Sequence, residues 1–112
     1  MRRLGKYERR AKLYAAYRSA AEGVKYYFLV RYVTPVWSSY KGPDREWAVY
    51  FRSRTDEESH ARLIGHHVEK DLAYKMVFDF YMKTEDLSWE ELQIKAAAAG
   101  VDTRWTKKTK RS

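Results

Sequence analysis

Two stretches of alternating side chains, residues 24–33 and 46–54, constrain the fold of this 112-residue chain more than any other feature. Both are rich in β-branched and aromatic residues, which favour β-strands. Because successive side chains of a strand point to opposite faces, each stretch has one mainly apolar face. These faces consist of Val24, Tyr26, Phe28, Val30 and Tyr32 on the first stretch and Trp47, Val49 and Phe51 on the second. An antiparallel hairpin with its apolar faces in the core is therefore predicted.

The other face of the predicted hairpin combines positive charge with aromatic rings. It carries Lys25, Tyr27, Arg31, Tyr50, Arg52 and Arg54. Cations bind phosphates and rings stack on bases, with ~1–3 kcal/mol for each stacked base. We therefore predict that these six residues form a nucleic-acid-binding platform. Sheets that face water also carry such side chains, because their stems cover the backbone, and Leu29 and Val33 leave open that the first helix packs on this face.

The segment between the two stretches contains turn signals. Pro35 lacks a backbone donor and limits ladder pairing, and Gly42-Pro43-Asp44 is typical of a turn. The segment is too long for a two-residue hairpin turn, so the register of the two strands stays open. A short extra strand within residues 36–40 is an alternative.

Residues 4–22 have apolar side chains at helical spacing. The stripe consists of Leu4, Tyr7, Ala11, Tyr14, Tyr17 and Ala21. Cations, Arg18 among them, occupy much of the remaining circumference, and Gly23 is expected to end the helix in a left-handed cap. The sequence therefore predicts an amphipathic helix with a basic outer face, from which Arg9 and Arg10 would add phosphate contacts to the platform.

Residues 55–83 are predicted to form the longest helix of the chain. Thr55-Asp56-Glu57-Glu58 has the pattern of a capping box. The apolar positions that continue from it at helical spacing are Ala61, Ile64, Val68 and Leu72. The second half of this helix is apolar on nearly all sides, so we expect it to form the centre of the core. Its surplus apolar face would form a homodimer contact.

A second capping box, Ser88-Trp89-Glu90-Glu91, predicts a last helix that ends at Gly100. The predicted fold class is thus α+β: an N-terminal amphipathic helix, an antiparallel β-hairpin or three-stranded sheet, a long central helix and a short C-terminal helix. The length suits a single compact domain, residues 1–102, which buries roughly 65% of its unfolded surface. Residues 103–112 form a basic C-terminal tail, in which Lys107 and Lys108 are further candidate phosphate contacts.

One pattern near the C-terminus consists of Ala96, Ala99-Gly100-Val101 and the basic run after Asp102. It resembles the helix-turn-helix pattern of bacterial repressors, and the resemblance implies a DNA-recognition helix capped by Asp102. The sequence departs from the family's pattern at Lys95 and Thr106, where apolar residues are expected. A plain helix end followed by a basic tail is the preferred interpretation.

The order helix–strand–strand–helix is similar to that of the double-stranded-RNA-binding domain. That family places phosphate-binding lysines at the start of its last helix. The corresponding position here carries the acidic residues 56–58, which would repel phosphate. This assignment is therefore rejected.

A metal site or an active site is not predicted. His60, His67 and Asp71 would share one side of the predicted helix 55–83, but zinc needs three or four ligands and no second cluster is visible in the sequence. The chain contains no cysteine, and no nucleophile elbow, phosphate-binding glycine loop or zinc-protease motif is visible. We expect a non-enzymatic protein without a metal or cofactor.

The net charge of +8 is concentrated in the hairpin and at the two ends. Residues 1–23 hold seven Lys or Arg and two acids, residues 24–54 six and two, and residues 100–112 five and one. Such a basic protein favours a polyanionic partner. The absence of cysteine suits a reducing compartment, and no stretch reaches the ~20 apolar residues of a membrane span. A cytoplasmic or other reducing intracellular compartment, with no membrane contact, is expected.

These features predict non-catalytic nucleic-acid binding. RNA or single-stranded DNA is slightly preferred over duplex DNA, because rings outnumber base-reading amides on the platform. The alternative is a small protein-binding inhibitor or adaptor, such as a phage-type antagonist of a nucleic-acid machine. Its phosphate-mimicking acids at helix starts would be Asp56, Glu57, Glu58, Glu90 and Glu91. A third hypothesis is a component of a ribosome-like assembly whose basic tails fold on RNA.

Overall fold

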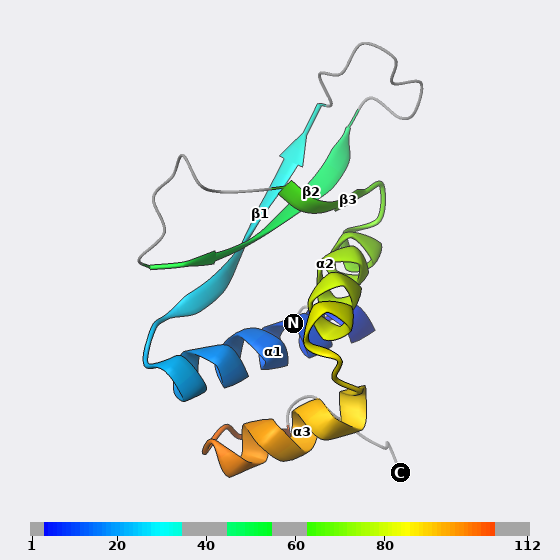
Figure 1. Cartoon of the computed structure of the whole chain (residues 1–112). Helices are drawn as coiled ribbons and strands as arrows, with labels where there is room; N and C mark the ends of the chain where they lie inside the picture. Colours follow the sequence, from blue (N-terminus) through cyan, green and yellow to red (C-terminus); the bar gives the residue numbers. More distant parts are fainter. Residues whose placement is uncertain (1–3, 35–44, 55–62, 105–112) are drawn as a thin grey trace.

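The structure, a computed structural model, describes residues 4–34, 45–54 and 63–104. These residues form three helices and a three-stranded antiparallel sheet (Figure 1). The elements follow the order α1 (Lys6–Glu22), β1 (Tyr26–Val33), β2 (Glu46–Ser53), β3 (Leu63–His67), α2 (Lys70–Glu85) and α3 (Trp89–Ala98). The predicted α+β class is confirmed, as is the order of first helix, hairpin, long helix and short helix.

The sheet has the strand order β1-β2-β3. β1 and β2 form the predicted hairpin, and their register, which the sequence left open, runs without a shift from Tyr26 opposite Ser53 to Val33 opposite Glu46. β3 pairs with the other edge of β2, and the register shifts once beside Val49. The third strand is therefore β3, whereas the alternative strand within residues 36–40 lies outside the described residues.

The prediction of a helix over residues 55–83 is wrong for residues 63–69. Residues 63–67 form β3, and α2 begins only at Lys70. Gly65 supplies a physical reason for the strand. A glycine inside a helix costs about 1 kcal/mol of helix stability, whereas in β3 its missing side chain lets the strand approach α2. A Cβ atom on Gly65 would lie 2.6 Å from the carbonyl oxygen of Ala73. Pairing with β2 and packing on α2 thus outweigh the helical spacing of Ile64 and Val68. The capping-box pattern at residues 55–58 lies outside the described residues.

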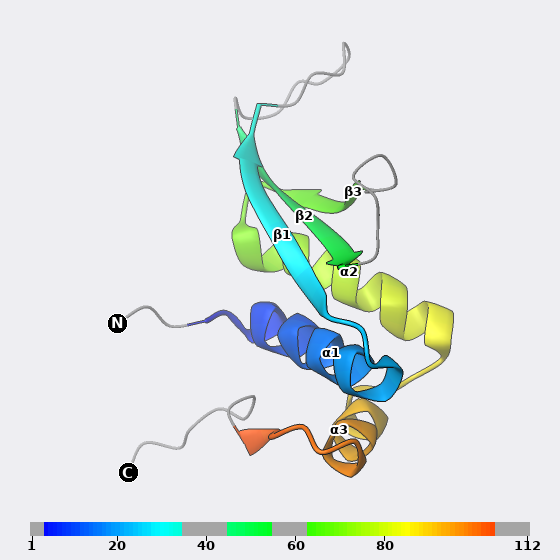
Figure 2. The same ribbon diagram turned by 90° about the vertical axis from the view of Figure 1, so that its left-hand side faces the viewer.

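Helix α1 lies in the middle of the molecule. It packs against α2 and the start of β1, and α3 packs on its far side, away from the sheet (Figures 1 and 2). Ala11 and Tyr14 of the predicted stripe are buried, but Ala21 is exposed. The buried residues of α1 are Glu8, Ala11, Leu13, Tyr14 and Ala15. The buried surface is broader than a single stripe because neighbours surround the helix, which ends at Gly23 in the predicted left-handed conformation with φ of 70°.

The N-terminus of α1 is capped by a residue of α2. Gly5 occupies the N-cap position and has no side chain to accept a hydrogen bond. Instead, the carboxylate of Asp71 accepts hydrogen bonds from the backbone N–H groups of Tyr7 (3.2 Å) and Glu8 (2.8 Å). This arrangement satisfies two free N–H groups and places a negative charge at the positive end of the helix dipole. Sequence reasoning missed this role, because Asp71 is more than sixty positions away along the chain.

Helix α3 begins and ends as its local sequence predicts. The capping box is confirmed in both directions, because the N–H of Glu91 donates to Ser88 Oγ (3.1 Å) and the N–H of Ser88 donates to Glu91 Oε1 (2.9 Å). Gly100 adopts a positive φ of 90° and follows the helix, while the N–H of Val101 donates to the carbonyl of Ala96 (2.9 Å). This is the bonding pattern of a Schellman helix end. The preferred interpretation of Gly100 as a helix end is therefore confirmed.

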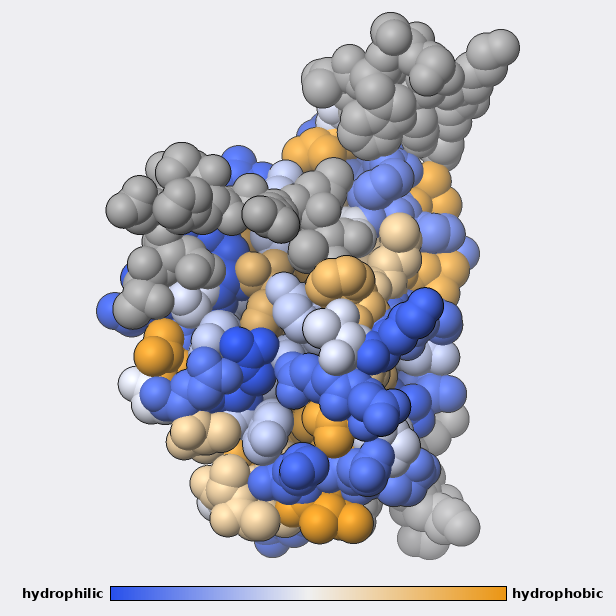
Figure 3. Space-filling view, in the orientation of Figure 1, coloured by the Kyte–Doolittle hydropathy of each residue, from blue (hydrophilic) through white to orange (hydrophobic). Residues whose placement is uncertain are grey.

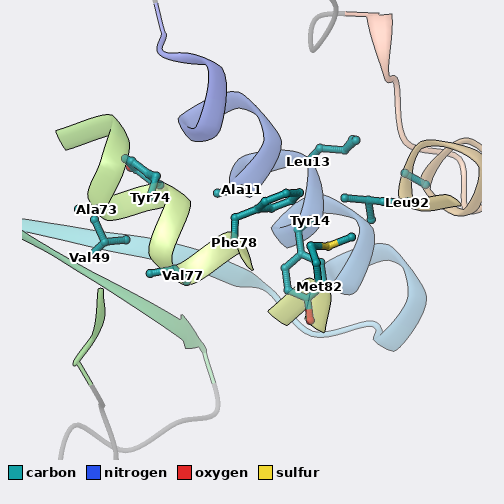
Figure 4. Packing of buried hydrophobic residues seen from close by; sticks show 11 residues of the cluster. Ala11, Leu13, Tyr14, Val49, Ala73, Tyr74, Val77, Phe78, Met82 and Leu92 are labelled. Atoms are coloured by element: carbon teal, nitrogen blue, oxygen red, sulfur yellow. The ribbon is translucent and has the colours of Figure 1, made fainter. Parts of the chain in front are cut away.

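The centre of the core lies between α1 and α2. Figure 4 shows the side chains of Tyr14, Phe78 and Met82 gathered there, with Val49 of β2 at one end of the cluster and Leu92 of α3 at the other. None of these five side chains is more than 8% exposed. The second half of the predicted long helix therefore contributes to the centre of the core as expected, and α1 shares that position.

Arg18 joins α1 to the sheet. Its guanidinium donates hydrogen bonds to the hydroxyl groups of Tyr14 (2.8 Å) and Tyr26 (2.9 Å) and pairs with Glu22. It also lies 4.4 Å from the centroid of the Tyr26 ring, close enough for a cation–π interaction. The assignment of Arg18 to a basic outer face is therefore wrong, because aromatic hydroxyls from two elements converge on its half-buried side chain.

Raising the pH above about 10 is expected to destabilise the fold through Tyr14. Burial, together with the hydrogen bond that Tyr14 donates to Glu85, raises the pKa of this phenol above its ordinary value. The unfolded chain then loses the proton first, so the stabilisation is complete below the unfolded pKa and declines as the pH rises toward the folded pKa. Urea unfolding from neutral to strongly alkaline pH measures this decline.

The matched variants for this prediction are Tyr14→Phe and Tyr17→Phe. Tyr14→Phe is expected to cost about 1 kcal/mol at neutral pH and to flatten the alkaline decline. Tyr17 packs at the edge of the same core, so Tyr17→Phe should leave the decline in place. An identical pH dependence in wild type and Tyr14→Phe would show that Tyr14 is not the group responsible.

Candidate nucleic-acid interface

The outer face of the sheet is the face turned away from α2. On the inner face, the ring of Phe28 contacts Tyr74 of α2, with 5.5 Å between centroids. Helix α1 also lies on the inner side, since its Tyr14 contacts the ring of Phe51 at 5.5 Å. Because side chains alternate along a strand, the six predicted platform residues point to the opposite side. The alternative that the first helix covers the platform is therefore wrong.

The register brings the predicted platform residues together in two adjacent rows. Tyr27 lies opposite Arg52, Leu29 opposite Tyr50, and Arg31 opposite Ala48. At one end Arg54 lies beside Lys25, whose carbonyl accepts the Arg54 N–H at 2.9 Å. With a rise of about 3.3 Å per residue, the rows extend for about 20 Å from Lys25 to Arg31.

The platform residues differ in exposure. Lys25 and Arg54 at one end and Arg31 at the other are exposed, whereas Tyr27 and Tyr50 are half-buried. Arg52 is only 8% exposed. Among the described residues, its Nε has no hydrogen-bond partner. The surface thus has a nearly buried guanidinium beside two rings, with accessible cations toward both ends.

A paired acid borders the platform beyond Arg31. Glu46, which is 5% exposed, has its Oε1 2.7 Å from Nδ1 of His66 on β3. His66 lies opposite Ala48 and therefore faces outward with the platform. Sequence reasoning missed this pair because it placed His66 on a helix. The pair therefore places an acid beside the Arg31 end of the platform.

The auxiliary arginines do not join the platform. Arg10 lies over the ring of Trp89, with 4.6 Å from its Cζ to the ring, at the contact between α1 and α3. Arg9 is half-buried, and its Nη1 donates to the carbonyl of Leu4 at 2.8 Å. Both are held on α1, apart from the outer face of the sheet. The other two predicted phosphate contacts, Lys107 and Lys108, lie outside the described residues.

The acids predicted to contact a protein partner are only partly described. Asp56, Glu57 and Glu58 lie outside the described residues. Glu90 is exposed. Glu91 takes part in the capping box, and its hydrogen bonds with Ser88 lower the pKa of its carboxyl. One of the two described acids therefore already has a structural role at the start of α3.

The predicted helical group of His60, His67 and Asp71 is not formed as such. His60 lies outside the described residues, and His67 is on β3, where its Nδ1 accepts the N–H of Glu69 at 3.0 Å. Asp71 caps α1. Within the described part of the chain, no group of three or more His, Cys, Asp or Glu side chains is placed to hold a metal ion.

A surplus apolar face remains on α2. Met76 is 41% exposed and Phe80, one turn later, is 50% exposed, whereas Val77 and Phe78 are buried in the chain's own core. On the face shown in Figure 3, the apolar areas (orange) are small and separated by hydrophilic side chains (blue). A homodimer through α2 stays a prediction, with Met76 and Phe80 as its described candidates.

In the described part of the chain, the helices are too short or too polar to cross a membrane. No family model, curated protein or solved structure matches the chain. What the protein binds is therefore inferred from the geometry and charge of its own residues.

Proposed function

We propose that the protein binds nucleic acid, without catalysis, on the outer face of β1 and β2. The observation that carries the proposal is the pairing of β1 with β2, continued by the Arg54–Lys25 backbone hydrogen bond, which brings four cations and two tyrosines to one face about 20 Å long. Neither α1 nor α2 lies on that side, because both contact inner-face rings. Alternating cations and rings suit a strand of phosphates and bases.

Arg52 supports an anionic ligand. A buried N–H group without an acceptor is destabilising, and Arg52 is 8% exposed with an unpaired Nε among the described residues. A phosphate oxygen would supply both the missing acceptor and the opposite charge, and such charge-assisted hydrogen bonds are among the stronger ones in proteins. Bound phosphate at the centre of the platform would therefore relieve an existing cost.

The two tyrosines favour an unpaired strand as the ligand. Tyr27 and Tyr50 lie on neighbouring strands, beside Arg52, and a ring stacks on a base only where that base is not enclosed in a duplex. Stacking tolerates any base, and phosphate contacts carry no sequence information. We therefore expect RNA or single-stranded DNA to bind in preference to duplex DNA, with little sequence preference.

Removing two exposed cations is expected to weaken binding. The variant Arg31→Gln/Arg54→Gln keeps the buried Arg52 in place, so the fold is retained. We expect an affinity for single-stranded RNA about tenfold lower, and a slope of log affinity against log salt that is smaller by about 1.4, because two phosphate contacts are lost. Fluorescence polarisation with random single-stranded RNA, single-stranded DNA and duplex DNA over a salt series measures both quantities.

The matched control is Lys83→Gln/Lys95→Gln. It removes the same charge from exposed positions on α2 and α3, away from the sheet's outer face. The control is expected to bind RNA within about twofold of wild type at moderate salt, because distant exposed charges are largely screened. Equal losses in the two double variants would mean that net charge, and not the platform, attracts the RNA. No binding by the wild-type protein would rule out the function itself.

A further inference from the structure

β1 is an edge strand with free backbone groups. Among the described strands, the order leaves one side of β1 without a neighbour, and in Figure 2 β1 is drawn in front of β2 with α1 beside only its lower end. In an antiparallel pair, the backbone N–H and C=O groups of successive residues alternate: those of one residue bond to the partner strand, and those of the next point away from it. Lys25 bonds to Arg54 of the hairpin, whereas the N–H of Tyr26 donates outward to Ser19 Oγ at 2.8 Å. The outward set is therefore Tyr26, Phe28, Val30 and Tyr32.

The middle of this edge is free within the described residues. At one end Ser19 occupies the N–H of Tyr26, and at the other Arg45 donates to the carbonyl of Tyr32 at 2.7 Å. Between them, no hydrogen bond to another described segment satisfies the outward N–H and C=O groups of Phe28 and Val30. Two consecutive outward residues offer donors and acceptors for a short added strand.

A groove lies beside the start of this edge, between β1 and α1. Its volume is about 650 Å³. The α1 side consists of Lys12, Ala15, Ala16, Ser19 and Ala20, and the other side of residues 25–28 and Tyr74. The small side chains of α1 leave space next to the strand, and rings form much of the opposite wall. A groove between a helix and an edge strand accommodates the side chains of an extended peptide that pairs with the strand.

The charges around the groove and edge are mainly positive. Lys12 and Lys25 line the groove and are exposed, and Arg31 and Arg45 are exposed toward the far end of β1. Among the described residues near this edge, the exposed acid Glu22 is already paired with Arg18 and accepts the hydroxyl of Tyr26 at 2.6 Å. The buried Glu8 lies 3.4 Å from Nζ of Lys12, so Lys25 is the groove cation without a described ion pair. Opposite charges attract an extended segment and align it with the strand.

We propose that an extended acidic segment of a partner protein adds to the sheet along β1. Its backbone pairs with Phe28 and Val30, an apolar side chain enters the groove over Ala16 and Ala20, and its carboxylates lie near Lys12 and Lys25. Lys25 and Tyr27 line this site and also belong to the proposed nucleic-acid platform. Ala16, Ala20 and the outward backbone groups of Phe28 and Val30 belong to this site alone, so substitutions on α1 test it separately.

The test uses a fluorescein-labelled octapeptide that alternates glutamate and valine. Wild-type protein is expected to bind this acidic peptide at least about tenfold more tightly than it binds a control peptide in which lysine replaces each glutamate. N-methylation of every second peptide nitrogen should lower the affinity by a further factor of about ten or more, because the pairing depends on backbone hydrogen bonds. NMR chemical shifts of the Phe28 and Val30 amides should move on titration.

A pair of single substitutions on neighbouring positions of α1 locates the site. Ala20 lines the groove and Ala21 does not, and both are exposed. Ala20→Glu is expected to weaken binding of the acidic peptide about tenfold by charge repulsion, whereas Ala21→Glu should change it by less than about twofold. Both changes are mild for an exposed helix position, so the fold is kept.

Three results would overturn the proposal. The first is no preference for the acidic peptide, and the second is equal weakening by Ala20→Glu and Ala21→Glu. The third is a concentration-dependent dimer whose contact shifts the same Phe28 and Val30 amides, which would assign the edge to a second copy of the chain. RNA titrations with Ala20→Glu and Ala21→Glu distinguish failure of this proposal from failure of the proposed nucleic-acid binding. Neither residue belongs to the platform and both variants add the same charge, so both should bind RNA with equal affinity.

Discussion

Replacing Gly65 with alanine is expected to destabilise the protein by about 3 kcal/mol. The added Cβ would lie 2.6 Å from the carbonyl oxygen of Ala73 and 3.0 Å from Met76 Cβ and Val77 Cγ2. The nearest atom belongs to the backbone of α2, so a change of side-chain rotamer cannot relieve the overlap. β3 must move away from α2, which separates packed surfaces and strains its pairing with β2. Urea unfolding followed by circular dichroism measures the loss.

The control for this substitution is Gly23→Asn at the end of α1. A Cβ at Gly23 would meet no atom within 4 Å, and asparagine tolerates the left-handed conformation better than most residues. We expect a cost below about 1 kcal/mol there. If Gly65→Ala unfolded at the same urea concentration as wild type, the close packing of β3 on α2 would be refuted.

Replacing Asp71 with alanine is expected to lower the free energy of unfolding by about 2 kcal/mol, although Asp71 belongs to neither the platform nor the groove. Its carboxylate accepts the N–H groups of Tyr7 and Glu8, and hydrogen bonds to a charged group contribute about 1.5–3 kcal/mol. Removal leaves the first turn of α1 uncapped and detaches it from α2. The free energy of unfolding in urea measures the loss, and Asp71→Asn should recover part of it.

Gly5 provides an independent check on this cap. A Cβ on Gly5 would lie 2.2 Å from Asp71 Oδ1, so Gly5→Ala should displace the carboxylate and cost nearly as much as Asp71→Ala. In a chain that already carries Asp71→Ala, the same Gly5→Ala change should be nearly neutral. The double-mutant cycle is expected to give a coupling energy of about 1–2 kcal/mol. Additive effects of the two substitutions would contradict the cap.

The candidate platform was predictable because it depends on alternation. Once residues 24–33 and 46–54 form strands, Lys25, Tyr27 and Arg31 must share a face, and the same holds for Tyr50, Arg52 and Arg54. Their different exposure was not predictable. Arg52 is nearly buried while Arg31 is exposed, and this difference depends on which neighbours the fold brings to each position.

Long side chains on α1 were the least predictable from sequence. Arg10 and Arg18 fall on the polar side of the helical pattern, but each lies over an aromatic ring contributed by another element, Trp89 and Tyr26 respectively. Helical spacing shows which residues share a side of the helix. It does not show that α2, α3 and β1 surround α1 on several sides, so it overstates the solvated surface.

The sequence by itself determined the features whose causes lie within a few residues: strand alternation in the hairpin, the capping box at Ser88, the helix ends at Gly23 and Gly100, and the distribution of charge. Only the tertiary structure decided that residues 63–67 form a strand, that Asp71 caps α1 and that β1 lies at the edge of the sheet formed by the described strands. The physical reason is that these features depend on pairing and packing between distant segments, which outweigh local propensities of about 1 kcal/mol or less.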